Sequence, residues 1–310
     1  MQNLKLIFRD CAVSGPSALF MAALFMAALF LAVPTLAGTA AETASGAASG
    51  IWQKTGEAAA RLIAGQSRVD GDGRIWLGLQ IRLAPGWKTY WRNPGESGAP
   101  PRLDWSTSGN LKEVEVRWPA PQRFSAFGFD SFGYHDEVVL PVLLTVAAPS
   151  RAATARLNLD YLVCAQVCVP VRAELALDLP ASTTGSKAGK AEPSAFAPLI
   201  RRYLDQVPQR EATAGLAIKS AVVSGPPGAQ ILQITGHSEQ PFTAPDLMVE
   251  GPEPFGFGRP KLTYGAGRHE VAMALPVYAG SGKAELTTQA LTLTMVDGHR
   301  AVERRVILGQ

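Results

Sequence analysis

Apolar and polar residues alternate with a period of two along most of the chain. The alternation is clearest at residues 75–83, 157–163 and 171–179. It predicts half-buried strands of an antiparallel sheet, each with one face against a core. Residues 138–146 are a more continuous apolar run, and Pro141 within it indicates an edge strand or a bulge, because proline cannot donate to a strand ladder.

These strands follow one another at intervals of about ten residues, with glycine and proline between them. The spacing is typical of a β-sandwich, and a barrel is the alternative that the pattern leaves open. From residue 216 the pattern resumes and repeats the order of the first half. We therefore predict an all-β chain of two tandem β-sandwiches, at residues 55–180 and 194–310.

The two halves share short motifs in the same order, which we interpret as a diverged duplication. The segments APPRLD (99–104) and EVVLPV (137–142) correspond to APDLMV (244–249) and to residues 270–277. In the second half, residues 293–301 occupy the position of a hairpin that carries two cysteines in the first half, and they contain no cysteine. Only the first sandwich is therefore expected to carry redox chemistry.

The periodicity stops at residues 181–193, where Ser, Thr, Gly, Lys and Ala dominate, and we interpret this stretch as a linker. Ser194 can then cap a short helix that ends before Pro208. The apolar residues of this helix share one face, at spacings of three and four: Phe196, Leu199, Ile200, Tyr203 and Leu204. We expect the helix to dock one domain on the other.

The amino terminus has the order of a secretory signal peptide, which we place at residues 1–40. Lys5 and Arg9 precede an apolar run at residues 18–33, and small residues follow it. The run is only slightly short of a membrane span, so an uncleaved anchor stays open as the alternative. Residues 41–54, rich in Ala, Gly and Ser, are expected to be flexible. In both cases the rest of the chain faces an oxidising compartment, where disulfides persist.

Composition narrows the class of partner. Apolar residues make up 47% of the chain and charged residues 18%, which is typical of a folded protein. The formal net charge is +3 and no basic cluster stands out, so nucleic acid is not an expected partner. No stretch after the leader is apolar enough to cross a bilayer, and membrane contact is expected only through a partner or an uncleaved leader.

The candidate chemistry lies in two cysteines, Cys164 and Cys168, within DYLVCAQVCVP at residues 160–170; the third, Cys11, lies in the leader. Strand-like sequence flanks the pair on both sides. A tight hairpin would make the two cysteines cross-strand neighbours with Cα atoms about 4.5 to 5.5 Å apart. That separation permits a reversible disulfide. Pro170 removes one backbone donor and helps to leave this edge open.

Two other interpretations of the cysteine pair stay open. As an inert staple it would close a ring of about five residues and stabilise the fold by only about 2 kcal/mol. Two thiolates also suit Cu(I), but His135 is the only histidine of the first domain and supplies no obvious third ligand. A closed zinc site needs four ligands, so zinc is not expected to bind at the cysteine pair. We therefore expect a redox pair with no metal and no cofactor, and we interpret His237, His269 and His299 as surface or loop residues.

Four segments together resemble the amino-terminal periplasmic domain of the thiol:disulfide interchange protein DsbD, and within that family the ScsB-type relatives linked to copper-sensitivity suppression. They are PGWKTYWRNPGESG (85–98), WPAPQRF (118–124), FGY (132–134) leading into VLPV (139–142), and residues 161–170. The resemblance covers residues 55–180 and extends only weakly into the second half. It implies an immunoglobulin-like sandwich that receives electrons from a membrane-embedded domain through a thioredoxin-like domain.

The resemblance also implies roles for single residues. Cys168 matches the cysteine that forms mixed disulfides with partners, and Cys164 the one that resolves them. In the family an aromatic cap loop shields the pair. Its phenylalanine corresponds to Phe127, with Phe124 and Phe129 as close alternatives.

The chain departs from the family pattern in three ways. The spacing between the cysteines is shorter, so the hairpin must be tighter. Ser125 and Ala126 stand where the family has an acidic pair before the cap phenylalanine. No transmembrane electron conduit follows, so a separate membrane-embedded reductase of the DsbD or ScsB type is expected as a partner. The aromatic residues Trp87, Tyr90 and Trp91 are expected to pack in the core, with a partner-docking surface as the alternative.

Taken together, the residues and the resemblance predict a periplasmic thiol:disulfide oxidoreductase. It would relay electrons through a reversible Cys164–Cys168 disulfide between thioredoxin-like proteins, the membrane reductase and periplasmic thiol proteins. Two alternatives belong to other classes. One is a copper(I)-binding accessory protein of a copper-tolerance system, and the other is a structural interaction module with an inert disulfide.

Overall fold

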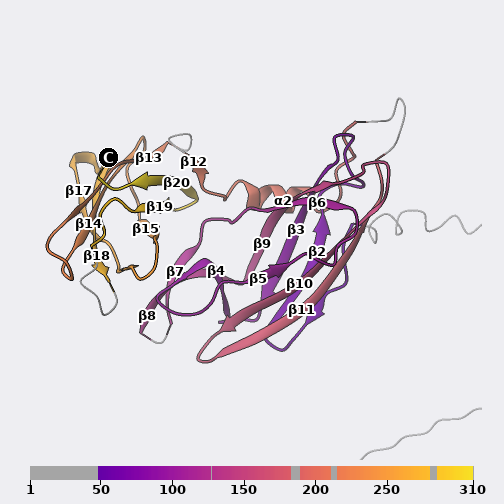
Figure 1. Cartoon of the computed structure of the whole chain (residues 1–310), viewed down its shortest axis with the longest axis horizontal. Coiled ribbons are helices and arrows are strands. Elements are labelled where there is room, and N and C mark those ends of the chain that lie inside the picture. The colour runs from indigo at the N-terminus through magenta and orange to yellow at the C-terminus, as the bar shows by residue number, and fades with distance from the viewer. Residues whose placement is uncertain (1–47, 127, 183–188, 211–214, 280–284, 310) are drawn as a thin grey trace, which may run out of the picture. The chain divides into compact units, whose positions relative to one another are not determined.

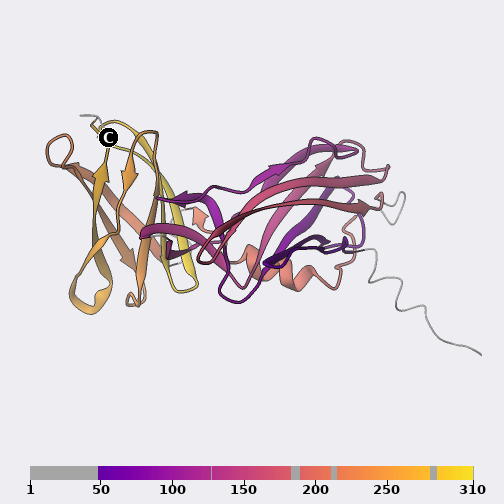
Figure 2. The same cartoon turned by 90° about the horizontal axis from the view of Figure 1, so that it is seen from below.

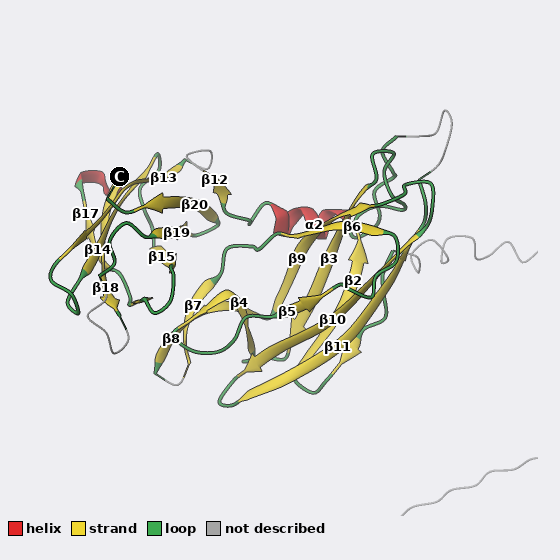
Figure 3. Ribbon diagram, viewed as in Figure 1, coloured by secondary structure: helices red, strands yellow, loops and turns green. Residues whose placement is uncertain are grey.

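The computed structural model of the chain describes residues 48–126, 128–182, 189–210, 215–279 and 285–309 (Figures 1 and 3). The predicted signal peptide and Phe127 lie outside these residues. Within them the chain is almost entirely β, with one α-helix, α2 (Ala197–Leu204), and a short 3-10 helix, η3 (Ala266–Arg268). None of the described helices is long and apolar enough to cross a membrane.

The first half of the chain folds into two antiparallel sheets. One sheet has the strand order β1 (Gln53–Lys54), β2 (Ala58–Ala64), β3 (Arg74–Leu83), β9 (Glu137–Val146) and β6 (Leu111–Val116). The other has the order β11 (Cys168–Leu179), β10 (Ala153–Cys164), β4 (Lys88–Gly95), β8 (Phe129–His135) and β7 (Gln122–Ala126), and β5 (Arg102–Asp104) also pairs with β10. Apolar residues of both sheets form one core, as their period-two alternation predicts.

Pro141 does not mark an edge strand, so that prediction is wrong. Its strand, β9, lies between β3 and β6, and Pro141 is opposite Gly78 of β3. The carbonyl of Pro141 accepts a hydrogen bond from the backbone N–H of Arg117, the residue that follows the last paired residue of β6, Val116. The carbonyl and the nitrogen of one strand residue point to the same side, so the nitrogen of Pro141 also faces β6 just beyond its end. Because no ladder donor is needed past the end of β6, the proline is tolerated inside the sheet.

The segments that flank the first sandwich are more tightly held than we expected. Within the segment predicted to be flexible, Ser49 forms a bridge with Ile63 and Gly50 N–H donates to the Leu62 carbonyl at 2.8 Å. Within the predicted linker, Pro193 forms a bridge with Gln66, and Ala191 is buried. Residues 183–188 of that linker lie outside the described part of the chain.

Helix α2 packs on the first sandwich, and its expected role in docking one domain on the other stays a prediction. Its buried residues, Ile200 and Tyr203, belong to the first core, and the helix lies against β9 and β3 (Figures 1 and 2). The Tyr203 hydroxyl donates to the Glu137 carbonyl at 2.9 Å. Ser194 lies before the helix: its Oγ accepts a hydrogen bond from Phe196 N–H, and Phe196 is the N-cap residue.

The second half also forms two sheets around a separate core. One sheet has the order β12 (Gln209–Arg210), β20 (Arg300–Ile307), β19 (Ala290–Asp297) and β15 (Pro245–Glu250). The other has the order β13 (Leu216–Ser224), β14 (Ile231–Ser238), β18 (Glu270–Tyr278) and β16 (Gly256–Phe257), and β17 (Lys261–Tyr264) also pairs with β18. The predicted class, all-β with two tandem sandwiches, is confirmed.

Part of the strand pairing order is shared by the two sandwiches. The run β2-β3-β9 in the first corresponds to β13-β14-β18 in the second. The last hairpin of each sandwich, β10–β11 or β19–β20, pairs with the strand that contains the shared Ala-Pro motif or follows it, β5 or β15. Each sandwich therefore ends in an equivalent hairpin, and these two hairpins differ in chemistry.

Candidate functional site

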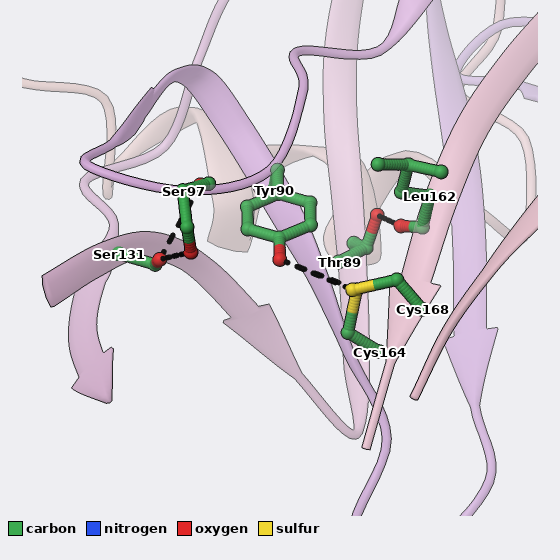
Figure 4. Close-up of a disulfide and its surroundings, with 7 residues drawn as sticks. All are labelled: Thr89, Tyr90, Ser97, Ser131, Leu162, Cys164 and Cys168. Atoms are coloured by element: carbon green, nitrogen blue, oxygen red, sulfur yellow. Dashed lines mark hydrogen bonds between the residues drawn. A yellow bond between two sulfur atoms is a disulfide. The ribbon is translucent and has the colours of Figure 1, made fainter. Parts of the chain in front are cut away.

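The two cysteines lie opposite each other at the end of the β10–β11 hairpin and form a disulfide (Figure 4). Antiparallel pairing runs along both strands from Ala153 and Leu179 to Cys164 and Cys168. Ala165 N–H donates to the Val167 carbonyl at 3.0 Å and closes the three-residue turn. The Cα atoms are 4.1 Å apart, slightly closer than we predicted, because the turn brings the two strands together where they end. The hairpin itself is as predicted.

The two cysteines differ in exposure. Cys164 is buried, with 3% of its surface exposed, whereas Cys168 is half-buried on the edge strand β11. Val167 in the turn is 61% exposed, and Pro170 on the same edge is also exposed. A thiolate that approaches from solvent therefore meets Cys168 before Cys164, and exchange requires such an approach.

Tyr90 of β4 covers the inner side of the disulfide. Its hydroxyl lies 3.2 Å from Cys164 Sγ and 3.6 Å from Cys168 Sγ (Figure 4). Burial raises the pKa of Tyr90, so the hydroxyl keeps its proton and is the donor to the sulfurs. The position of β4 is set by Thr89, whose Oγ1 donates to the Leu162 carbonyl at 2.9 Å.

Two glycines let the backbone approach this tyrosine closely. Gly98 has φ +94°, and a Cβ built there would lie 2.2 Å from Tyr90 Cζ. A Cβ on Gly133 of β8 would lie 1.9 Å from the carbonyl oxygen of Thr89. Since no side chain fits at either place, the glycines of the GESG and FGY motifs allow Tyr90 to be enclosed beside the sulfurs.

One predicted cap residue contacts this tyrosine. The ring centroid of Phe124 on β7 lies 5.9 Å from that of Tyr90, and Lys88 Nζ lies 5.3 Å from the Phe124 ring centroid. Phe129 on β8 is 53% exposed, and Phe127 lies outside the described residues. Of the two cap candidates that the structure describes, Phe124 is therefore the one that packs against Tyr90, whose hydroxyl contacts the sulfurs.

Sequence reasoning missed the contact between Tyr90 and the sulfurs. Tyr90 and Trp91 are almost fully buried, and Trp87 packs against the same core, as the packing interpretation expects. The signal that could have found the contact is chemical, because a buried tyrosine hydroxyl needs a polar partner. In the part of the chain that the structure describes, no group of three or more His, Cys, Asp or Glu residues is placed to hold a metal ion.

Comparisons with known proteins agree with this geometry. The family model described as "Thiol:disulfide interchange protein DsbD, N-terminal" matches residues 59–180, and a model described as a domain of unknown function (DUF8393) matches residues 206–310. The search of curated proteins found no match.

Among solved structures, the crystal structure of the N-terminal periplasmic domain of ScsB from Proteus mirabilis is similar along most of the chain. It has a TM-score of 0.67 and 25% sequence identity, and the match covers 85% of this chain and 99% of that one. A conserved domain protein from Bacillus anthracis aligns over 83% of this chain and 89% of its own, at 7% identity and a TM-score of 0.21, which does not indicate a shared fold.

Proposed function

We propose that this chain, whose residues 59–180 form a DsbD N-terminal-like domain, relays electrons between thiol:disulfide partners through the Cys164–Cys168 disulfide. The observation that carries the proposal is the asymmetry of the pair. One sulfur belongs to a half-buried residue at a sheet edge, and the other belongs to a buried residue beneath a tyrosine hydroxyl. In that arrangement a partner thiolate can attack Cys168 from solvent, and the buried Cys164 can re-form the disulfide by attacking Cys168.

The exchange proceeds in two balanced steps. A partner thiolate attacks Cys168 Sγ, a mixed disulfide forms, and Cys164 leaves as a thiolate. A second thiolate from the partner then attacks its own sulfur in the mixed disulfide and releases Cys168 as a thiolate. The pair has gained two electrons, two protons restore the thiols, and the partner is oxidised to its disulfide. The reverse sequence reduces an oxidised thiol protein.

Tyr90 would assist the departure of Cys164. Its protonated hydroxyl, 3.2 Å from Cys164 Sγ, can donate a hydrogen bond to the thiolate as charge develops there. A hydrogen bond to the charged form lowers the pKa of a thiol, and a less basic thiolate is a better leaving group. The same hydroxyl lies 3.6 Å from Cys168 Sγ, so it is placed beside both sulfurs of the exchange.

The partners follow from the same chemistry. A disulfide at a protein edge exchanges with a dithiol protein that presents an exposed nucleophilic cysteine, as thioredoxin-like domains do. A periplasmic location is supported by the similar ScsB domain, which is described as periplasmic, and residues 1–40, which have the order of a signal peptide, would export the chain. Reducing equivalents would come from a separate membrane-embedded reductase of the DsbD or ScsB type.

The test is to trap the mixed disulfide in cells with Cys164→Ser. Without the resolving sulfur, Cys168 stays linked to its partner, and non-reducing electrophoresis should show a higher-mass species that disappears with reductant. Cys168→Ser is the matched control, because the cysteine that remains, Cys164, is 3% exposed and should trap much less. If both variants give the same bands, or neither gives any, the relay is wrong and the disulfide is a staple.

A further inference from the structure

The hairpin that carries Phe124 is bound to the second sandwich through both of its strands. We call the two strands β7 (residues 122–126) and β8 (residues 129–135) the cap hairpin. Arg123 of β7 is almost buried, with its side chain 8% exposed, and its Nε and Nη2 each donate to the carboxylate of Asp246 at 2.8 Å. Nη2 also donates to the Leu247 carbonyl at 2.9 Å. Asp246 and Leu247 belong to β15, so the bidentate pair joins the cap hairpin to the second sandwich.

A second arginine binds the opposite strand of the same hairpin. Asp130 of β8 accepts hydrogen bonds from Arg123 Nη1 at 3.0 Å and from Arg259 of the second sandwich, at 3.0 Å from Nε and 2.5 Å from Nη2. The hydrogen bond from Arg259 holds the pKa of Asp130 below its ordinary value, so this carboxylate is charged at neutral pH. Both strands of the cap hairpin are thus held by charge-assisted bonds.

Strand alternation links these bonds to the disulfide. Arg123 and Phe124 are consecutive residues of β7 and therefore point to opposite faces of the sheet. Arg123 is directed to the second sandwich, while the Phe124 ring stacks toward Tyr90, whose hydroxyl contacts both sulfurs. A shift of β7 that moves Phe124 away from Tyr90 must also disturb the bonds of Arg123.

The strand that carries Tyr90 is held in the same way. The pairing of β4 with β8 is irregular between Tyr90 and Gly95, and residues of this bulge reach the second sandwich. Arg92 forms ion pairs with Glu250 at 2.6 Å and with Glu303, and Asn93 Nδ2 donates to the Val249 carbonyl at 3.2 Å.

We propose that the second sandwich is a clamp that holds the cap hairpin and Tyr90 over the disulfide, and that release of this clamp exposes the pair to its partners. The proposal rests on the proposed function, since it concerns the access of thiols to the same two sulfurs. Arg123, Asp130, Asp246 and Arg259 are positioning residues: they act through Phe124 and Tyr90 and touch no sulfur. A partner that competes for these charges would open the cap as it docks, which couples docking to reactivity.

The test compares two variants of the full chain that lose the same charge. Arg259→Gln removes the bond to Asp130, and Arg305→Gln removes an exposed arginine of β20 for which the structure records no bond. The Arg259 side chain is 64% exposed, so its loss should not unfold the protein. The readout is the rate at which dithiothreitol reduces the oxidised protein, followed by quenching with an alkylating reagent. A small dithiol reports access to the sulfurs without a protein docking surface.

We expect Arg259→Gln to be reduced about two- to fivefold faster than wild type, the effect of weakening one partly exposed ion pair. Arg305→Gln should match wild type, and Asp246→Asn, which weakens the pair with Arg123, should also accelerate reduction. The equilibrium reduction potential should not change, because a clamp alters access and not the sulfur chemistry. Added salt should accelerate wild type more than Arg259→Gln, since it screens the same charges.

The outcomes separate the two proposals. If Arg259→Gln is reduced no faster than Arg305→Gln while both are readily reduced, the clamp is wrong and the electron relay stands. If the potential shifts together with the rate, the second sandwich acts on the disulfide itself and the clamp is also wrong. If no variant and no wild-type protein is reduced while folded, the relay fails, and the clamp fails with it.

Discussion

The two final hairpins of the molecule occupy equivalent places and are closed by different cross-strand links. In the first sandwich Cys164 and Cys168 are opposite each other and share a disulfide. In the second sandwich the corresponding residues are Asp297 and Arg300, also opposite each other, which form an ion pair at 2.5 Å. One fold thus carries either a covalent link that can be exchanged or a polar link that cannot.

The surroundings of the two links explain the difference. The Asp297 side chain is 1% exposed and accepts hydrogen bonds from Thr243 N–H and Oγ1 and from Ala244 N–H, while Arg300 donates to Ser238 Oγ. The disulfide is contacted by the Tyr90 hydroxyl and lies at a sheet edge. A link bound on every side holds a hairpin shut, whereas a link with few partners can be opened without breaking a network.

The largest effect that would test this contrast is expected at Asp297. Asp297→Ala should lower the free energy of unfolding of the second sandwich by about 3 to 5 kcal/mol, because it leaves Arg300 unpaired in a nearly buried site. Hydrogen exchange of β19 and β20, measured by mass spectrometry on the full chain, reports this loss without contribution from the first sandwich.

Glu270→Ala is the control, since that side chain is 51% exposed and pairs only with His237; it should change stability by about 0.5 kcal/mol or less. Burial alone would raise the pKa of Asp297, but hydrogen bonds from Ala244, Thr243 and Arg300 hold it below its ordinary value. Its stabilisation is therefore complete above the unfolded pKa, 3.8, and is lost as the pH falls through the lower folded value. The difference in the free energy of unfolding between Asp297→Ala and wild type should therefore disappear over that acidic range. A difference that stays constant with pH would contradict the role of the charged Asp297 carboxylate.

Removing the disulfide should cost less than removing Asp297. A variant with both Cys164→Ser and Cys168→Ser loses the closure of a short ring, which we expect to lower the free energy of unfolding by about 2 kcal/mol. All six tryptophans of the chain lie between residues 52 and 118, so tryptophan fluorescence during urea unfolding reports the first sandwich alone. The reduced wild-type protein should unfold at the same urea concentration as the variant. A loss as large as that of Asp297→Ala would mean that both links are structural.

The smallest effect is expected from the tyrosine hydroxyl that contacts the disulfide. Tyr90→Phe keeps the ring and removes the hydroxyl, so the pKa of the Cys164 thiol should rise and reduction by dithiothreitol should slow by about threefold. Tyr203→Phe is the matched control, because that hydroxyl donates to the Glu137 carbonyl away from the disulfide. If Tyr90→Phe is reduced as fast as wild type, the hydroxyl has no role in the exchange and Tyr90 only packs.

Several features of this protein followed from local pattern. Alternation at residues 157–163 and 171–179 predicted the two strands, and the three residues between the cysteines predicted the hairpin that joins them. These predictions held because strand periodicity and turn length depend on neighbours in the sequence. The motif resemblance also led to Phe124 as a cap candidate.

Tertiary structure decided the rest, because it depends on residues far apart in the chain. Tyr90 meets Cys164 across 74 positions, Arg123 meets Asp246 across 123, and Pro141 is tolerated only because a neighbouring strand ends beside it. Period two tells which face of a strand is apolar, but not which strand or domain lies against that face. The sequence by itself therefore determined that a cysteine hairpin exists, and only the packing of two sandwiches decided what covers it and what holds that cover in place.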